Sequence, residues 1–383
     1  MVYVLILFTV EEFMSGTIEE RYLAVKQRPT GFDYMRLLLS IAVVAIHSVA
    51  VSQGLAAENA YWNSPMGWLL RQVLPMFFAL SGFLVAGSLY RVPSVPRFLG
   101  LRAIRIYPAL TVEVVLSAFV IGPLLTSYAL GDYFADPRFM SYLWNMLGHI
   151  HFILPGVFEQ NAYPALVNLQ LWTVPYELYC YLVIAALAYA GIARRWQLAV
   201  VAPIALTIVY AVGRAASKNW DWTPGYNTVP GWLLVASFLY GVTLYILRGR
   251  IPYSGRVFVV CAVGSIGAAC WFDYGVYVLP FFASYCTVYV GLWNPRKTGF
   301  LKGADYSYGI FLYGFVVQQT VAQVFGAGYA AWFNFSVSMP FIVLFAALSW
   351  HFVEKPALNL RKYILPKATP APTDVAQAAV HSA

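Results

Sequence analysis

The sequence predicts an all-α polytopic membrane protein with about ten transmembrane helices and with both termini in the cytoplasm. Of its 383 residues, 61% are hydrophobic and only 10% are charged, and the mean hydropathy is +0.67. A water-facing surface needs more charge than this, so the composition excludes a soluble globule. Long apolar runs such as residues 233–247 lack the alternation of a membrane β-barrel strand, and the crossings are therefore predicted to be helical.

Ten apolar stretches have lengths that suit a lipid bilayer. A hydrocarbon core about 30 Å thick needs roughly 20 residues for each helical crossing. The predicted crossings lie near residues 35–53, 66–90, 106–125, 171–190, 197–212, 230–247, 257–272, 274–293, 306–325 and 333–353.

The distribution of Lys and Arg predicts the orientation of these crossings. The formal net charge of +8 would suggest a nucleic-acid partner for a soluble protein. Here, however, 20 of the 24 Lys and Arg residues fall in alternate connecting segments, which the positive-inside rule places in the cytoplasm. We therefore interpret the positive charge as a signal for membrane orientation and expect no nucleic-acid partner. The basic residues on the opposite side are Arg71, Arg138, Arg214 and Lys218.

The chain is predicted to consist of three regions. Residues 1–30 are expected to form a cytoplasmic or interfacial segment, in which the apolar start Met1–Phe13 can lie at the membrane surface. Residues 31–363 form the membrane domain, and residues 364–383 form a Pro/Ala/Thr-rich tail that is expected to be disordered. Within the membrane domain, residues 126–169 are predicted as one long outward-facing loop. Its aromatic and amide side chains suit sugar hydroxyls, but the loop can equally be a solvated cap over the helix ends.

The first crossing carries Arg36 and His47 on one face. Eleven residues separate them, which on a helix is about 20° past three turns and about 16.5 Å along the axis. A histidine in the membrane can act as a general base near neutral pH, and an arginine at the inner edge can hold a phosphate. Two simpler interpretations stay open: His47 can be a packing residue, and Arg36 can be an anchor that extends to the interface.

Two arginines and two buried acids follow. Arg102 and Arg105 share one face at the start of the third crossing, where two guanidiniums suit a polyanion, although the topology alone also explains them. Glu177 can orient His47, bind a substrate hydroxyl or complete a structural ion pair. Glu113 is likewise expected to need a buried partner.

The remaining polar residues are expected to pack helices. The Cys residues show no spacing typical of a zinc site, and His149 and His151 lack a third ligand, so no metal is expected. Interhelical hydrogen bonds are predicted for Gln318, Gln319, His351 and Glu354.

These residues, in this order, resemble the acyltransferase family 3 of integral membrane O-acyltransferases, over about residues 30–362. The late segment Ser307–Tyr313 is followed by Gly314, at a position where the family often has a histidine. A second histidine is therefore missing, which makes His47 the stronger candidate for the catalytic residue. The motifs that carry the resemblance are Phe32–Arg36 followed by ten residues and His47, residues 75–84 (PMFFALSGFL), Phe98 through Arg102 and Arg105 to Pro108, Leu171–Thr173 with Glu177, and Val353–Pro356.

The resemblance implies an acyl-CoA donor, usually acetyl-CoA, that enters from the cytoplasm. It implies transfer to a hydroxyl of an envelope or secreted glycan, such as a lipopolysaccharide or an exopolysaccharide, by a protein of the bacterial inner (plasma) membrane. It further implies that His47 is essential, that Arg102 and Arg105 are associated with the donor, that Arg36 pairs with the histidine motif and that Glu177 is the acid of the Leu-Trp-Thr segment.

CoA is a polyanion that cannot enter hydrocarbon, whereas its neutral pantetheine arm can pass between helices. We therefore expect a passage from the arginines to His47, which acts either as general base or through an acyl-histidine intermediate. Two other function classes stay open at this point. One is a permease for a glycan or lipid-linked intermediate with the same polar residues as a proton relay, and the other is a membrane scaffold. The sequence indicates no oligomeric state.

Overall fold

The computed structural model describes residues 16–365, apart from residues 28, 93, 193–194, 217–228, 298, 300–303 and 327. The apolar start Met1–Phe13 and the tail after Pro366 therefore lie outside the described residues, and their predicted states are not tested. Of the predicted N-terminal segment 1–30, the part from residue 16 is described.

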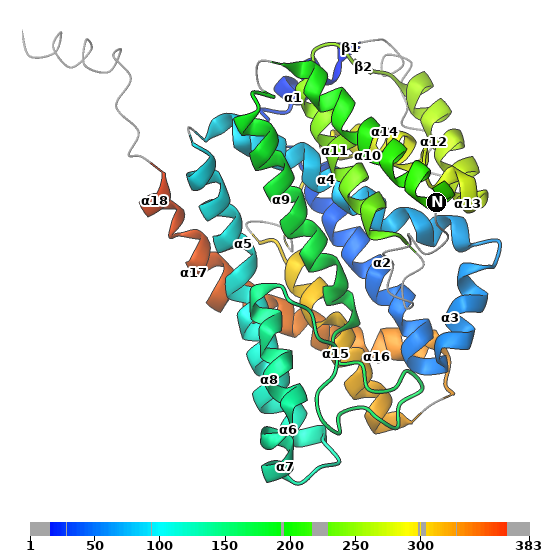
Figure 1. Ribbon diagram of the computed structural model, residues 1–383, viewed down its shortest axis with the longest axis vertical. Helices are drawn as coiled ribbons and strands as arrows, with labels where there is room; N and C mark the ends of the chain where they lie inside the picture. Colours follow the sequence, from blue (N-terminus) through cyan, green and yellow to red (C-terminus); the bar gives the residue numbers. More distant parts are fainter. Residues whose placement is uncertain are drawn as a thin grey trace, which may run out of the picture.

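The described chain is an all-α bundle with one very small sheet (Figure 1). Strand β1 (Gly16–Thr17) pairs antiparallel with β2 (Pro252–Tyr253), and helix α1 (Ile18–Ala24) follows β1 directly. The Thr17 side chain accepts a hydrogen bond from the Glu20 backbone N–H, and the Glu20 carboxylate accepts one from the Thr17 backbone N–H. This pair of bonds forms a capping box at the start of α1. In Figure 1 this group lies at one end of the molecule, and α6, α7 and α8 lie at the opposite end.

A helix overlaps each of the ten predicted crossings. Several crossings are built from consecutive helical pieces with a change of winding between them. The elements are α2 (Gly31–Gln53), α4 (Gly67–Arg91), α5 (Val95–Leu116) with η2 (Ser117–Ile121) and α6 (Gly122–Leu125), η4 (Leu169–Thr173) with α9 (Val174–Tyr189), α10 (Trp196–Ala216), α11 (Gly231–Ile246), α12 (Gly255–Cys270), α14 (Leu279–Gly291), α15 (Ser307–Phe325), and α16 (Ala331–Ser349) with η6 (Trp350–Glu354), α17 (Lys355–Leu358) and α18 (Arg361–Ile364).

Six helical segments of the described chain are long and apolar enough to cross a membrane. The apolar helices α11, α12 and α14 are shorter, at 16, 16 and 13 residues. An all-α membrane protein is thus confirmed, whereas the number of ten crossings and the cytoplasmic location of both termini stay predictions. The six segments are residues 31–53, 67–91, 95–125, 169–189, 196–216 and 331–364.

Small residues allow the central helices to approach each other closely. A Cβ atom on Gly82 of α4 would lie 2.0 Å from the Phe238 carbonyl oxygen of α11, and one on Gly241 of α11 would lie 2.1 Å from the Ala79 carbonyl oxygen of α4. Backbone contact of this kind is typical of helix pairs in membranes, where apolar side chains gain nothing by leaving lipid. The α4–α11 pair therefore forms a fixed wall beside the site described below.

Residues 126–169 differ from the single surface loop that the sequence predicts. They form α7 (Leu130–Ala135), α8 (Pro137–Leu143) and η3 (Trp144–Leu147), followed by an irregular stretch that returns into the bundle. Aromatic side chains explain the folding of the helical part, because Tyr133 is buried and its hydroxyl donates to the Ala118 carbonyl at 2.7 Å. In the irregular part, the buried Gln319 amide of α15 donates to the Tyr163 and Leu166 carbonyls at 2.7 and 2.8 Å.

The partner expected for Glu113 is present. Its Oε1 accepts hydrogen bonds from Ser117 Oγ at 2.6 Å and from Asn168 Nδ2 at 2.5 Å, and all three residues are buried. The predicted interhelical bond of Gln318 is also confirmed, since its amide donates to the Val44 carbonyl of α2 at 2.8 Å. The Gln318 bond thus fastens α15 to α2, and the Asn168 bond fastens α5 to the residue directly before η4.

Candidate active site

The three arginines singled out in the sequence line one cavity of about 130 Å³. Arg36 lies in the second turn of α2, whereas Arg102 and Arg105 lie one turn apart on α5. Glu177, near the start of α9, lines the same cavity. Three helices that are distant in sequence thus bring all four charged residues together. We call this space the arginine cavity; its other lining residues include Leu74, Phe77, Ser81, Thr173, Tyr181, Phe238, Tyr308 and Phe311.

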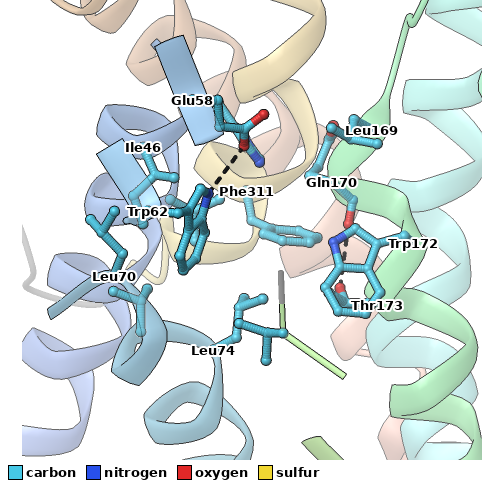
Figure 2. A pocket seen from close by; sticks show the side chains of 14 residues that line it. Ile46, Glu58, Trp62, Leu70, Leu74, Leu169, Gln170, Trp172, Thr173 and Phe311 are labelled. Carbon is cyan, nitrogen blue, oxygen red and sulfur yellow. Dashed lines mark hydrogen bonds between the residues drawn. The ribbon is translucent and has the colours of Figure 1, made fainter. Parts of the chain in front are cut away.

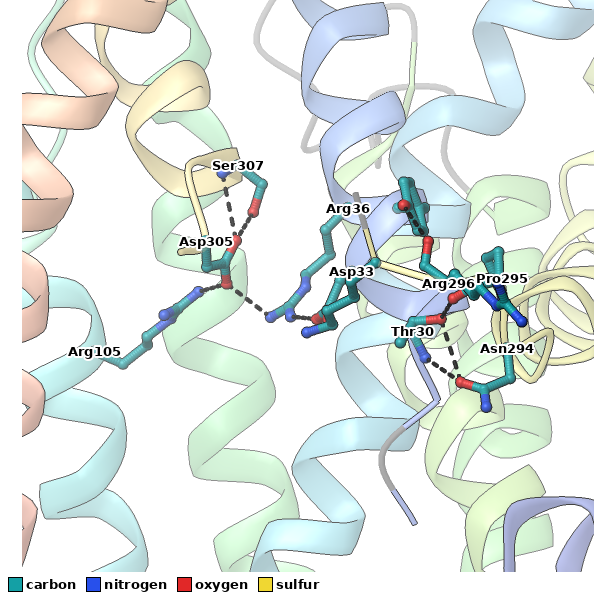
Figure 3. A network of polar contacts seen from close by, with 11 residues as sticks. Thr30, Asp33, Arg36, Arg105, Asn294, Pro295, Arg296, Asp305 and Ser307 are labelled. Carbon is teal, nitrogen blue, oxygen red and sulfur yellow. Dashed lines mark hydrogen bonds and ion pairs between the residues drawn. The ribbon is translucent and has the colours of Figure 1, made fainter. Parts of the chain in front are cut away.

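Two of the arginines are held by acids (Figure 3). Asp305 Oδ2 lies 2.7 Å from Arg105 Nη2 and 3.1 Å from Arg36 Nη1, and it thereby joins α2 to α5. Arg36 also contacts Asp33 at 2.6 Å, and Asp33 contacts Lys297 at 2.6 Å. These three cations and two acids leave one positive charge in the network, which is consistent with an anion-binding surface.

Asp305 is anchored just before the start of α15. The Ser307 hydroxyl donates to its Oδ1 at 2.5 Å. Burial opposes ionisation of Asp305, but the charges of Arg36 and Arg105 outweigh burial and hold the pKa of its carboxyl well below the usual range. The acid is therefore charged and fixes both guanidiniums. The sequence analysis did not predict a role for Asp305, although an acid directly before the predicted crossing at residues 306–325 was a usable signal.

Arg102 differs from the other two arginines because it pairs with no carboxylate among the described residues. Its Nη2 donates a long bond to Ser88 Oγ at 3.3 Å, and its guanidinium carbon lies 5.8 Å from the centre of the Phe98 ring. Its Nε is buried and has no hydrogen-bond partner there. Arg102 therefore brings to the arginine cavity a guanidinium that no ion pair with a described residue holds in place.

His47 lines a second cavity, of about 50 Å³. Its ring packs edge-on against Phe315 of α15, with centroids 5.2 Å apart and planes at 86°. No hydrogen bond joins the imidazole to another residue in the described part of the chain. Figure 2 shows the walls of this His47 cavity, with Glu58 and Trp62 from α3 (Leu55–Trp62), residues of η4 opposite, and Phe311 between them.

The two cavities share a wall. Leu74 of α4, Thr173 of η4 and Phe311 of α15 line both of them. His47 is thus not enclosed by packed side chains, but the continuous passage that the sequence analysis expected is divided by this shared wall. The imidazole cavity and the arginine cavity are therefore neighbours with three lining residues in common.

Glu177 does not lie where one of its predicted roles requires it. Its Oε1 accepts a hydrogen bond from the Tyr181 hydroxyl at 2.5 Å, and it lines the arginine cavity but not the His47 cavity. The acid of the His47 cavity is Glu58, which sequence reasoning missed. Its spacing of four residues from Trp62 on a short helix was the available signal, since such spacing lets a carboxylate and an indole meet.

The two polar residues expected to join helices near the chain's end behave differently from the prediction. Glu354 is buried and accepts a hydrogen bond from Ser349 Oγ at 3.1 Å, and the His351 ring contacts the Ala347 carbonyl at 2.8 Å. Both bonds stay within the α16–η6 segment instead of bridging two helices. His351 is exposed, and its ring lies beside that of Tyr306, directly before α15, with centroids 6.2 Å apart.

Comparison with known proteins agrees with this arrangement. The family model described as an acyltransferase domain matches residues 30–351. An O-acetyl transferase of Shigella phage Sf6 is 25% identical over 342 residues, which cover 85% of this chain and 94% of that protein. Nodulation protein 10 of Rhizobium leguminosarum bv. viciae is 26% identical over 351 residues, which cover 86% and 94%. No solved structure matches. Because the match spans most of the chain and includes both cavities, the protein belongs to acyltransferase family 3.

Proposed function

We propose that this protein transfers an acyl group, acetyl in the simplest case, from acyl-CoA to a hydroxyl of an envelope or secreted glycan. The family and the phage relative named as an O-acetyl transferase support acyl transfer within a membrane. The observation that carries the proposal is the arrangement of the site. A cavity with three arginines adjoins a cavity with one imidazole, across a wall of three side chains.

The arginine cavity is the donor side of this proposal. Arg102 offers a guanidinium that forms no ion pair with a described residue, while Arg36 and Arg105 are already oriented by Asp305. Phosphate groups gain charge-assisted hydrogen bonds from such a set, and preorganisation lowers the entropy that is lost on binding. The same reasoning assigns the arginine end of the bundle to the cytoplasm, where acyl-CoA is available, and fits the distribution of Lys and Arg in a ten-helix bacterial inner-membrane protein. Glu177 belongs to this donor side.

The thioester arm then passes the shared wall towards His47. The arm is uncharged, so it can lie among Leu74, Thr173 and Phe311 without the desolvation cost that phosphates would meet. Passage requires these side chains to part, which rotation of the Phe311 ring and of the Leu74 side chain allows.

The transfer itself takes place at the imidazole. A ring nitrogen of His47 removes the proton from the acceptor hydroxyl as the oxygen attacks the thioester carbonyl. The new carbon–oxygen bond forms, the carbon–sulfur bond breaks, and the CoA sulfur leaves with the proton that His47 has taken. Since the imidazole has no hydrogen-bond partner among the described residues, one nitrogen is available to the acceptor.

The test is acyl transfer in isolated membranes. We would incubate membranes with radiolabelled acetyl-CoA and purified envelope polysaccharide from the host strain, and compare wild type with His47→Ala and Arg102→Ala. Loss of a general base costs about 10²- to 10⁴-fold in rate, so His47→Ala should reduce labelling by at least a hundredfold. Label retained on the denatured wild-type protein would indicate an acyl-histidine intermediate in place of direct transfer.

A matched control is His351→Ala, because this second imidazole is exposed and lines neither cavity. It should label the polysaccharide at the wild-type rate. Unimpaired transfer by His47→Ala would refute the mechanism. Movement of unmodified glycan without any need for acetyl-CoA would instead support a permease.

A further inference from the structure

We propose that Glu58 is a binding residue for the acceptor, and that its carboxylate accepts a hydrogen bond from a hydroxyl next to the one that reacts at His47. This inference rests on the proposed function and names the chemistry of the second substrate: a neutral polyhydroxyl compound, presented on the α3 side of the His47 cavity (Figure 2).

The environment of Glu58 indicates that the carboxylate faces a ligand. The residue is only 7% exposed, and its Oε1 accepts a long hydrogen bond of 3.4 Å from Trp62 Nε1. Its Oε2 is buried and accepts no hydrogen bond of good geometry from a described residue. Burial raises the pKa of the Glu58 carboxyl, and the nearby Trp62 and Tyr163 donors oppose that rise. Glu58 forms no ion pair with any residue that the structure describes. A buried carboxylate with spare acceptor capacity is costly unless a donor fills it.

A second buried acceptor lies across the same cavity. The Gln170 amide nitrogen donates to the Leu312 carbonyl at 2.7 Å and to Asn168 Oδ1 at 3.2 Å, which fixes the orientation of its amide. Gln170 Oε1 is buried and has no hydrogen-bond partner among the described residues. Glu58 and Gln170 thus offer oxygen acceptors from opposite walls, and hydroxyl groups are the donors that such acceptors suit.

The remaining walls suit the apolar faces of a sugar ring. Trp62 is contributed by α3 and Trp172 by η4, and Phe311 lies between these walls (Figure 2). Aromatic walls with a few polar groups that converge on the ligand are typical of small-molecule sites. The charge of Glu58 also repels phosphate, so this cavity favours a neutral acceptor over the nucleotide end of the donor.

One of the two interpretations of residues 126–169 gave this segment the contacts with sugar hydroxyls. Of that segment only Leu169 lines the His47 cavity, as the first residue of η4. The geometry therefore assigns acceptor contact to α3 and η4.

The experiment measures steady-state transfer by Glu58→Gln with purified envelope polysaccharide as acceptor and acetyl-CoA as donor. The amide keeps the shape but loses the negative charge, so the acceptor KM should rise about tenfold to a hundredfold, as expected for the loss of a hydrogen bond to a charged group. The KM for acetyl-CoA and the thermal stabilisation by CoA should stay at wild-type values. Trp62→Phe, which keeps an aromatic ring but removes the indole N–H that holds Glu58, should raise the acceptor KM a few-fold, and Glu58→Asp should lie between Glu58→Gln and wild type.

The matched control is Asp273→Asn, which removes an exposed acid of α13 (Phe272–Gly275) that lines neither cavity. It should change no kinetic constant. An unchanged acceptor KM in Glu58→Gln, or a loss of CoA stabilisation in that variant, would overturn the role given to Glu58. Failure of the proposed function looks different, since the wild type itself would then transfer no acetyl group from acetyl-CoA to the polysaccharide.

Discussion

Arg102 allows donor binding to be separated from folding, because it is the arginine of the donor cavity without a carboxylate partner among the described residues. Removal of Arg36 or Arg105 would leave Asp305 with one cation fewer in a largely buried position. Removal of Arg102 leaves no acid unpaired, and the bond it gives up is a long one of 3.3 Å to Ser88. We therefore expect Arg102→Ala to fold nearly as well as wild type and to bind CoA less tightly.

The size of the effect follows from charge-assisted hydrogen bonding. A hydrogen bond from a guanidinium to a phosphate contributes about 2 kcal/mol, or roughly 30-fold in Kd. At a CoA concentration of about 100 times the wild-type Kd, binding stabilises the wild type by about 2.7 kcal/mol. A Kd that is roughly 30-fold weaker reduces this stabilisation to about 0.9 kcal/mol at the same concentration.

The assay is thermal unfolding of detergent-solubilised protein over a series of CoA concentrations. Arg102→Ala should unfold near the wild-type temperature without CoA and should need roughly 30-fold more CoA for an equal upward shift. Arg97→Ala is the matched control, because Arg97 lies on the same helix but is exposed and does not line the cavity. If CoA stabilises Arg102→Ala as strongly as wild type, the assignment of the arginine cavity to the donor is wrong.

Two further outcomes follow from the same contacts. Asp305→Asn should destabilise the protein by about 1–3 kcal/mol. This is below the usual cost of breaking a buried ion pair, because the side chains of Arg36, Arg105 and Asp305 each keep about a fifth of their surface exposed. CoA should restore part of the lost stability, because its phosphates can take the place of the carboxylate between the two arginines. Since the lowered pKa of Asp305 means that its stabilisation is complete above about pH 4 and is lost only as the pH falls further, the melting temperatures of wild type and variant should converge only in strong acid. Phe311→Ala should remove part of the wall between the cavities. In competition assays, the preference for acetyl-CoA over butyryl-CoA should then fall about tenfold. An unchanged ratio of acetyl to butyryl transfer would show that the wall does not limit the size of the acyl group.

Helical periodicity explains why part of the site was predictable. The phase of Arg36 and His47 on one helix, and of Arg102 and Arg105 on another, depends only on residue spacing. The structure places the three arginines in one cavity and His47 in the adjoining one, as that spacing suggests. The apolar stretches also located the helices, because membrane length is a local property of sequence.

The acids were harder to place because their partners are set by how helices meet. One of the three roles predicted for Glu177 requires it to lie beside His47, yet α9 begins inside the bundle, where Glu177 lines the cavity of the α5 arginines. Asp305 and Glu58 lie in a connection and in a short helix, where hydropathy carries no signal. The contacts of Asp305 join α2 and α5 at the start of α15. No spacing rule along a single segment predicts such a contact.

The distribution of charge between the two cavities gives the transfer a direction. When Asp33, Asp305 and Glu177 are all counted against Arg36, Arg102, Arg105 and Lys297, the arginine cavity and the ion pairs beside it keep one positive charge. The titratable groups that line the His47 cavity are His47 and one acid, Glu58. A phosphate is attracted to the first cavity and repelled by the second, while a neutral sugar is indifferent to the first and finds hydrogen-bond acceptors in the second. Because only Leu74, Thr173 and Phe311 lie between them, the uncharged thioester arm is the part of the donor that can reach the imidazole. Charge thus keeps the two substrates in separate cavities, and they meet only at the wall that the cavities share.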